Sequence, residues 1–259
     1  MLIGPDSYFR KLPGDNRKQA LLIDGIRYSI QMSDLAYESL KQMLGDLSLR
    51  YFQPEFKLHD EGVAVMLQAW SIIDSVHRIR CLLNQTPSLN QKEPYLRLFY
   101  DSTRTIEDMR NCVQHQTSEV EEYIKHDSTI WGVLSWCYKP DPAILKVFSF
   151  VLIPGTMFQA KEHHLVNPSG RSMSLPVGLI TLSVNDMILC LSDVLGALAK
   201  LAPELETRVK SICLGKAAAG SDALVAAELD FAEAGSGVRI AQGDRLGIGV
   251  NKSSKQNAK

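Results

Sequence analysis

Residues 60–83 read DEGVAVMLQAWSIIDSVHRIRCLL, and this stretch decides the fold class. One face of the stretch is built at steps of three and four residues from Val63, Met66, Trp70, Ile73 and Val76, which are apolar, followed by Ile79 or Arg80. That spacing places them on one face of an α-helix. Acidic residues come first and basic residues last, which complements the helix dipole. The stretch therefore predicts a long amphipathic helix that packs against other helices.

On the C-terminal side, a further long helix is predicted from Pro94 to about His126, since proline is tolerated in the first turn of a helix. The polar run DSTRT at 101–105 interrupts its apolar face, which indicates a polar partner there. The expected buried residues are Leu98, Phe99, Ile106, Met109, Val113, Val120 and Ile124.

On the N-terminal side, SDLAYESLKQML at 33–44 predicts a helix that is capped by Ser33 and ends at Gly45. Before it, ALLIDGIRYSI at 20–30 predicts a β-hairpin, because Asp24-Gly25 favours a type I′ turn. A helix is the alternative over 20–30, but a glycine inside it would weaken it.

After residue 127 the sequence becomes rich in β-branched and aromatic residues. Three runs, at 129–138, 144–153 and 175–184, predict a small antiparallel sheet of about three strands, which the hairpin at 20–30 could extend. Asn185 is then expected to cap a fourth long helix over 186–212, which Pro203 would kink or divide.

These elements predict a mainly α fold, α+β overall, made of a helical bundle with a small inserted antiparallel sheet. The expected organisation is an N-terminal segment with a hairpin over 1–32, the bundle over 33–213 with its β insertion at about 129–184, and a tail over 214–259. The tail is rich in glycine and alanine, which predicts flexibility with at most one short helix around 222–232.

Composition excludes several classes of protein. The 259 residues carry a net charge of -1, so the chain lacks the basic excess of a non-specific nucleic-acid binder. Five widely spaced cysteines without a C-x-x-C pair indicate neither a disulfide framework nor a zinc site. The N-terminus lacks a signal-peptide core, and no window reaches the ~20 apolar residues of a membrane span. A cytoplasmic protein that binds no membrane, metal or cofactor is expected.

One octapeptide, MRNCVQHQ at 109–116, brings several reactive residue types together. On a helix Asn111 and His115 share a face, whereas Arg110 is rotated by roughly 100° from Asn111. The imidazole can exchange a proton near neutral pH, the guanidinium can bind phosphate, and the amide can orient either group. RNA cleavage by the 2′-hydroxyl needs these groups, although a polar helix face bonded to a neighbour has the same spacing.

The longer string IEDMRNCVQH at 106–115 resembles the signature of the HEPN superfamily. In that signature an arginine, followed by a polar residue that is often asparagine, precedes a histidine by a handful of positions on a helix. Arg110, Asn111 and His115 match it, with apolar Ile106 and Met109 upstream. The helices over 33–124 and 185–212 resemble the helical bundle of the family, and the β insertion departs from its minimal form.

The resemblance implies a metal-independent endoribonuclease whose paired arginines and histidines meet in a homodimer, in a toxin–antitoxin or phage-defence setting with a cognate antitoxin. His115 would act as general base or acid, Arg110 would hold the scissile phosphate, and Asn111 would orient the histidine. The five-residue offset between Arg110 and His115 agrees with a site shared by two subunits. Other members keep the bundle without catalysis, so an interaction or oligomerisation module is the alternative.

Three further arginines, Arg78, Arg80 and Arg104, are the candidate substrate-binding residues for an RNA phosphate. Local charge supports them weakly, because residues 70–115 contain six basic and five acidic side chains. Stabilisation of a helix C-terminus would explain Arg78 and Arg80 equally well.

Overall fold

A computed structural model describes residues 1–58, 60–87, 89, 92–115, 120–125, 129–141, 143, 146–155, 165–173, 175–220 and 222–224. The chain divides into two units, Met1–Gly220 and Ser221–Lys259, and every helix and strand among the described residues belongs to the first. Its helices are η1 (Tyr8–Arg10), α1 (Arg17–Tyr51), α2 (Glu61–Gln85), α3 (Pro94–Ser102), α4 (Ile106–Gln114), α5 (Val120–Lys125) and α6 (Leu191–Cys213). Its strands are β1 (Val133–Tyr138), β2 (Phe148–Leu152), β3 (Val177–Val184) and β4 (Met187–Cys190). The predicted mainly helical α+β fold is confirmed.

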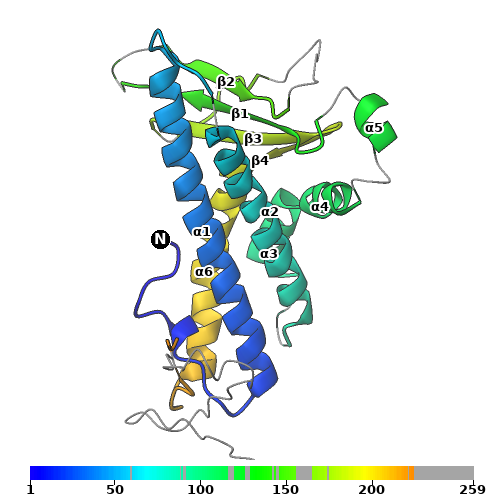
Figure 1. Cartoon of the computed structure of the whole chain (residues 1–259). Coiled ribbons are helices and arrows are strands. Elements are labelled where there is room, and N and C mark those ends of the chain that lie inside the picture. The colour runs from blue at the N-terminus through cyan, green and yellow to red at the C-terminus, as the bar shows by residue number, and fades with distance from the viewer. Residues whose placement is uncertain are drawn as a thin grey trace, which may run out of the picture. The chain divides into compact units, whose positions relative to one another are not determined.

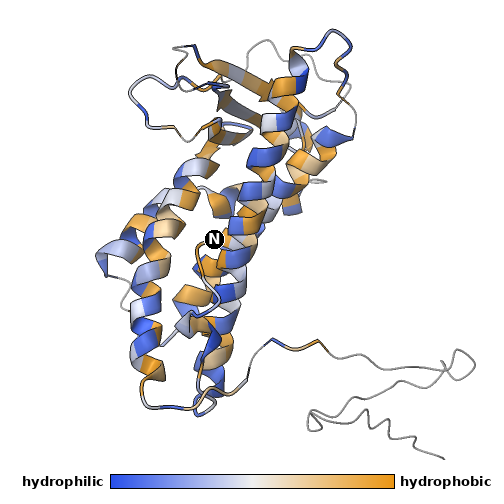
Figure 2. Cartoon of the chain, turned by 90° about the vertical axis from the view of Figure 1, so that its left-hand side faces the viewer, coloured by the Kyte–Doolittle hydropathy of each residue, from blue (hydrophilic) through white to orange (hydrophobic). Residues whose placement is uncertain are grey.

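Helix α2 confirms the long helix predicted at 60–83. Met66, Ile73, Val76 and Ile79 are buried as expected, whereas Val63 is exposed and Trp70 is half-buried. The helix packs along α1, and hydrophobic and hydrophilic residues alternate along the long helices (Figure 2). The apolar face of α2 therefore forms part of the core, while its first turns expose apolar side chains.

The hairpin predicted at 20–30 is wrong, because these residues belong to α1. Ile23, Ile26 and Ile30 follow one helical face and are buried. Gly25 suits the helix because a Cβ there would lie 3.0 Å from Leu82 Cδ1, so the missing side chain allows α2 to come close. Helix packing thus outweighs the turn preference of Asp24-Gly25. The helix expected over 33–44 is part of the same α1, which continues past Gly45.

The single helix predicted from Pro94 to about His126 is divided into α3, α4 and α5. The division after α3 occurs at Thr103, whose side chain is fully buried and donates a hydrogen bond to Phe99 O over 2.6 Å. Arg80 of α2 donates to Thr103 Oγ1 over 2.8 Å and to Tyr100 O over 3.1 Å. The polar run at 101–105 therefore has the polar partner that its sequence indicates.

The predicted buried face of these three helices is partly right. Phe99, Ile106 and Met109 are completely buried. Val113 is half-buried, and Leu98, Val120 and Ile124 are exposed. Because the chain is divided into α3, α4 and α5, Val120 and Ile124 do not continue one helical face with Phe99.

The four strands form one antiparallel sheet in the order β2-β1-β3-β4. The three predicted strands are confirmed as β1, β2 and β3, and the added strand is β4 rather than an N-terminal hairpin. Asn185 does not cap a helix. It has a φ of 52° in the tight turn between β3 and β4, a conformation that asparagine tolerates.

Helix α6 consequently begins at Leu191, and it continues through Pro203 without a break. It contacts α1, α3 and β3, so it joins the helices to the sheet. Within the first unit, the sheet lies across one end of α1 and α2, and α4 lies beside α2 on the side away from α1 (Figure 1). No helix among the described residues is long and apolar enough to cross a membrane.

Candidate functional site

The signature residues lie on the outer side of the molecule, where α4 packs against α2. Arg110 and Asn111 belong to α4, and His115 follows the last residue of the helix. The backbone N–H of His115 donates to Asn111 O over 3.0 Å, so both remain on one turn. Asn111 and His115 are exposed, and Arg110 keeps 28% of its side-chain surface accessible. The buried Ile106 and Met109 fix the opposite face of α4 in the core.

Arg110 is held by two neighbours, one from each helix. Its Nε donates to Asp74 Oδ1 of α2 over 3.0 Å, and its Nη1 donates to Gln114 Oε1 over 3.0 Å. The second N–H of Nη1 and both of Nη2 have no partner within the described part of the chain. The guanidinium is thus oriented by both helices, while 28% of the side-chain surface remains accessible.

His77 of α2, absent from the sequence-based candidates, lies in the same cluster. Burial lowers the pKa of its imidazole, and the positive charge of Arg110 lowers the pKa further, against the opposing effects of Glu107 and Asp74. Its Nε2 lies 3.5 Å from Cys81 Sγ, and its buried Nδ1 has no hydrogen-bond partner among the described residues. His77 is therefore neutral at neutral pH, so it adds no positive charge beside Arg110.

The lowered pKa of His77 predicts a pH dependence of stability. Above the ordinary histidine pKa of 6.5 both the folded and unfolded states are neutral at this position. As the pH falls through 6.5 the unfolded chain takes up the proton first, so the free energy of unfolding decreases. We expect wild type to lose more stability than His77→Gln between pH 7.5 and pH 5, measured by urea denaturation. Equal losses in the two proteins would contradict this assignment.

The three predicted substrate-binding arginines have different surroundings. Arg78 and Arg104 are exposed. Arg80 is half-buried, bonds Tyr100 O and Thr103 Oγ1, and lies 5.2 Å from the centroid of the Tyr100 ring. Arg80 therefore joins α2 to the end of α3, which is a structural use of its guanidinium.

Arg80→Ala is expected to lower the free energy of unfolding by about 2 kcal/mol, because it leaves the buried Thr103 hydroxyl and a carbonyl without their charged donor. Arg78→Ala is the matched control from the same helix, and its exposed side chain predicts a change within about 0.5 kcal/mol. Chemical denaturation of both variants measures the difference. A loss as small for Arg80→Ala as for Arg78→Ala would show that the Arg80 contacts contribute nothing to stability.

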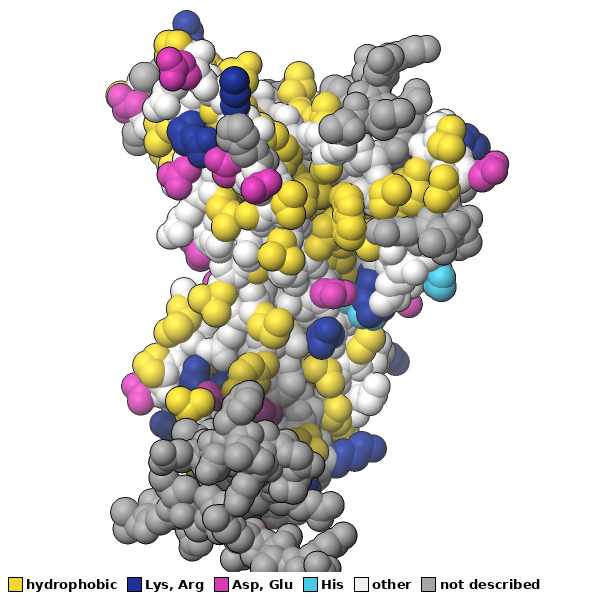
Figure 3. Space-filling model, in the orientation of Figure 1, with side chains coloured by type: hydrophobic (Ala, Val, Ile, Leu, Met, Phe, Trp, Pro, Cys, Tyr) yellow, Lys and Arg dark blue, Asp and Glu magenta, His cyan; other side chains and the backbone are white. Residues whose placement is uncertain are grey.

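Exposed apolar side chains lie on α2 toward its sheet-facing end. Val63 and Leu67 expose 72% and 63% of their surface, and Trp131 exposes 48%. Trp131 is joined to the helix by a hydrogen bond of 3.1 Å from Trp70 Nε1 to its carbonyl. Figure 3 shows hydrophobic side chains gathered below the sheet on this face, while acidic and basic side chains are interspersed. The face is apolar and not strongly basic.

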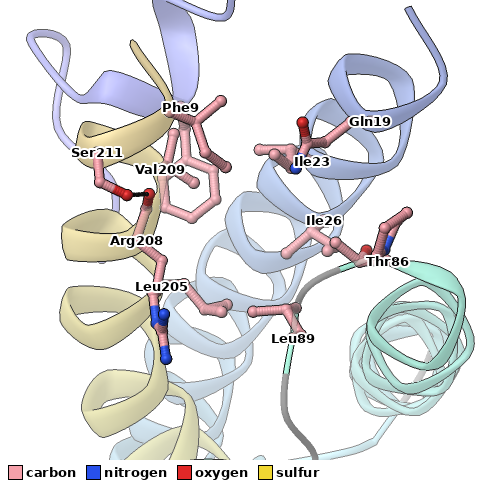
Figure 4. Close-up of a pocket in the computed structure, with 12 residues that line it drawn as sticks. Phe9, Gln19, Ile23, Ile26, Thr86, Leu89, Leu205, Arg208, Val209 and Ser211 are labelled. Carbon is pink, nitrogen blue, oxygen red and sulfur yellow. Dashed lines mark hydrogen bonds between the residues drawn. The ribbon is translucent and has the colours of Figure 1, made fainter. Parts of the chain in front are cut away.

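A cavity of about 100 Å³ lies elsewhere, between α1, α6 and η1. Figure 4 shows that its wall is mostly apolar, with Phe9, Ile23, Ile26 and Leu205 around it. Arg208 is paired with Glu93 over 2.8 Å. The cavity offers burial to a small apolar group and brings none of the signature residues together.

Within the described residues, no three side chains of histidine, cysteine, aspartate or glutamate are grouped as a metal site would require. The chemistry available at the α2–α4 site is anion binding by Arg110 and proton transfer by His115. Comparisons of the chain with protein-family models, curated proteins and solved structures found no match.

Proposed function

We propose that this protein is a HEPN-like endoribonuclease that acts as a homodimer without a metal ion. The observation that carries the proposal is the state of Arg110, which Asp74 and Gln114 orient while 28% of its side-chain surface stays accessible. A guanidinium fixed in this way suits the two oxygens of a phosphate. His115, exposed one helical turn beyond Asn111, supplies an imidazole for proton transfer.

In the proposed reaction the 2′-hydroxyl of a ribose loses its proton to one imidazole, and its oxygen forms a bond to phosphorus. The bond from phosphorus to the 5′-oxygen breaks, and that oxygen takes a proton from a second imidazole. The products are a 2′,3′-cyclic phosphate and a 5′-hydroxyl. One chain supplies His115, and the partner subunit's His115 would supply the second group, which explains why a homodimer belongs to the proposal.

Arg110 stabilises the additional negative charge on the phosphate as the new bond forms. Asn111 precedes His115 by one turn, and in the proposed site its amide orients the imidazole. Of the flanking arginines, Arg78 and Arg104 are exposed and can contact neighbouring phosphates, while Arg80 is already bonded within the fold. A defence or toxin–antitoxin setting with a cognate antitoxin, in the cytoplasm, completes the proposal on the strength of the family resemblance alone.

The test is to incubate the purified protein with total RNA in the presence of a metal chelator. Fragments that end in a 2′,3′-cyclic phosphate are expected. Intact RNA after prolonged incubation with a dimeric preparation would overturn the proposal.

A second candidate function is a non-catalytic interaction module, and the exposed apolar side chains Val63, Leu67 and Trp131 favour it. A patch of this kind is typical of a protein-binding surface. Leu67→Glu would then abolish partner binding while RNA remains intact with every variant. The polar signature fits this alternative less well, because a purely structural role predicts a buried trio, whereas Asn111 and His115 are exposed.

A further inference from the structure

The Arg110 guanidinium shares its cluster with two acidic residues, Asp74 and Glu107. Asp74 accepts its Nε–H directly, and Glu107 lies close enough to act on the neighbouring imidazole of His77. The positive charge of Arg80 also reaches this imidazole, but its guanidinium is bonded to Tyr100 and Thr103. Because burial and Arg110 keep His77 neutral, the histidine adds no positive charge. The cluster therefore offers an anion the oriented N–H donors of Arg110, but its net charge attracts the anion only weakly.

That balance distinguishes two kinds of phosphate. An internal phosphodiester carries a single negative charge, whereas a terminal phosphomonoester carries about -1.5 to -2 at pH 7. The outer N–H groups of Arg110 can bond either anion. The second charge of a monoester, however, would be repelled by the carboxylate of Asp74, which stays within hydrogen-bond distance of the same guanidinium.

We propose that Asp74 is a positioning residue that orients Arg110 and restricts it to the monoanionic phosphodiesters inside an RNA chain. The inference rests on the proposed function, since it names the substrate class of the same site. This role explains why a phosphate-binding arginine is paired with an acidic residue. The hydrogen bond from Nε fixes the orientation of the guanidinium plane, and the negative charge of the carboxylate disfavours RNA ends that carry a phosphomonoester.

Binding of an oligonucleotide that cannot be cleaved tests the inference. A fluorescent 2′-deoxy octanucleotide is prepared with hydroxyl ends and with phosphate ends, and both dissociation constants are measured by anisotropy at low ionic strength. Wild type is expected to bind the two about equally. Asp74→Asn, which keeps the acceptor oxygen but removes the charge, is expected to prefer the phosphorylated form by roughly fivefold. Asp74→Ala, which also removes the acceptor, is expected to weaken binding of both forms severalfold.

Asp193→Asn is the matched control, because Asp193 forms a comparably exposed pair with Arg171 on another part of the surface. It should behave as wild type, and Arg110→Ala should lose affinity for both forms. Wild type that prefers phosphorylated ends severalfold, Asp74→Asn that shows no preference, or a wild type that binds neither form would overturn the inference. If the discrimination is found but RNA is never cleaved, the inference stands and the nuclease proposal falls. If RNA is cleaved but the discrimination is absent, the nuclease proposal stands and the inference falls.

Discussion

Arg110→Ala and His115→Ala should each reduce RNA cleavage by about 10²- to 10⁴-fold, the range expected when a charge-stabilising group or a proton-transfer group is removed. Arg110 is the oriented cation of the site, and His115 is its exposed imidazole. His115 is exposed, so its loss should leave the free energy of unfolding nearly unchanged. Arg110 is bonded to Asp74 of α2, so its loss should lower the free energy of unfolding by about 1 kcal/mol. Initial rates on a single-stranded RNA, measured with a chelator present, give the two effects.

Two variants distinguish a specific role of Arg110 in the reaction from a general effect of positive charge on RNA binding. Arg104→Ala removes an exposed positive charge two residues before α4, and it should reduce cleavage by less than about tenfold. Arg110→Lys keeps the charge but cannot bond two phosphate oxygens through a planar fork, so it should remain strongly impaired. Equal cleavage by wild type, Arg110→Ala and His115→Ala would assign any observed activity to a contaminant and end the nuclease interpretation.

The sheet and the long helices show which parts of the fold the sequence could predict. The helix at 60–83 was predictable because its apolar residues recur over nearly five turns, from Val63 to Ile79, and it is observed as Glu61–Gln85. The runs that form β1, β2 and β3 were predictable from their β-branched and aromatic residues. In each case the pattern lies within one segment and is long enough to determine the secondary structure of that segment.

Errors arose where a contact distant in the sequence decides the structure. Residues 20–30 carry a strong turn signal, and only the approach of Leu82 to Gly25 shows why a helix is preferred there. The break after α3 lies at Thr103, whose hydroxyl is bonded by Arg80, a residue 23 positions earlier in the chain. Strand β4 pairs with β3 and is followed directly by α6, and nothing in the apolar run Met187–Cys190 marks where the strand ends and the helix begins.

The residues of the candidate site also fall into two groups, those that a local motif indicates and those that only the packing of the helices brings together. A motif on one helix indicates Arg110, Asn111 and His115, and they lie on and just after α4. Asp74 and His77 were missed as site residues because nothing in their own segment says that α4 packs against that face of α2. Their spacing of three residues places them together on α2, and this is the one signal that could have drawn attention to them.

The largest loss of stability is expected at Gly132, just before β1. This glycine has a φ of +77°, and a Cβ there would lie 2.4 Å from the carbonyl oxygen of Ser183 and 2.8 Å from Val184 Cγ2. The obstructing oxygen belongs to the backbone of β3, which cannot move without disturbing its pairing with β1. Gly132→Ala should therefore lower the free energy of unfolding by about 3 kcal/mol or more.

Gly170→Ala separates the two causes of that loss. Gly170 has nearly the same φ, +72°, but nothing lies within 4 Å of the added Cβ. It should therefore show only the cost of the left-handed conformation, about 1 kcal/mol. Denaturation of both variants under the same conditions isolates the contribution of the close approach between residue 132 and β3. If the two losses are equal, backbone strain alone explains them, and the contact with Ser183 does not hold the start of β1 in register.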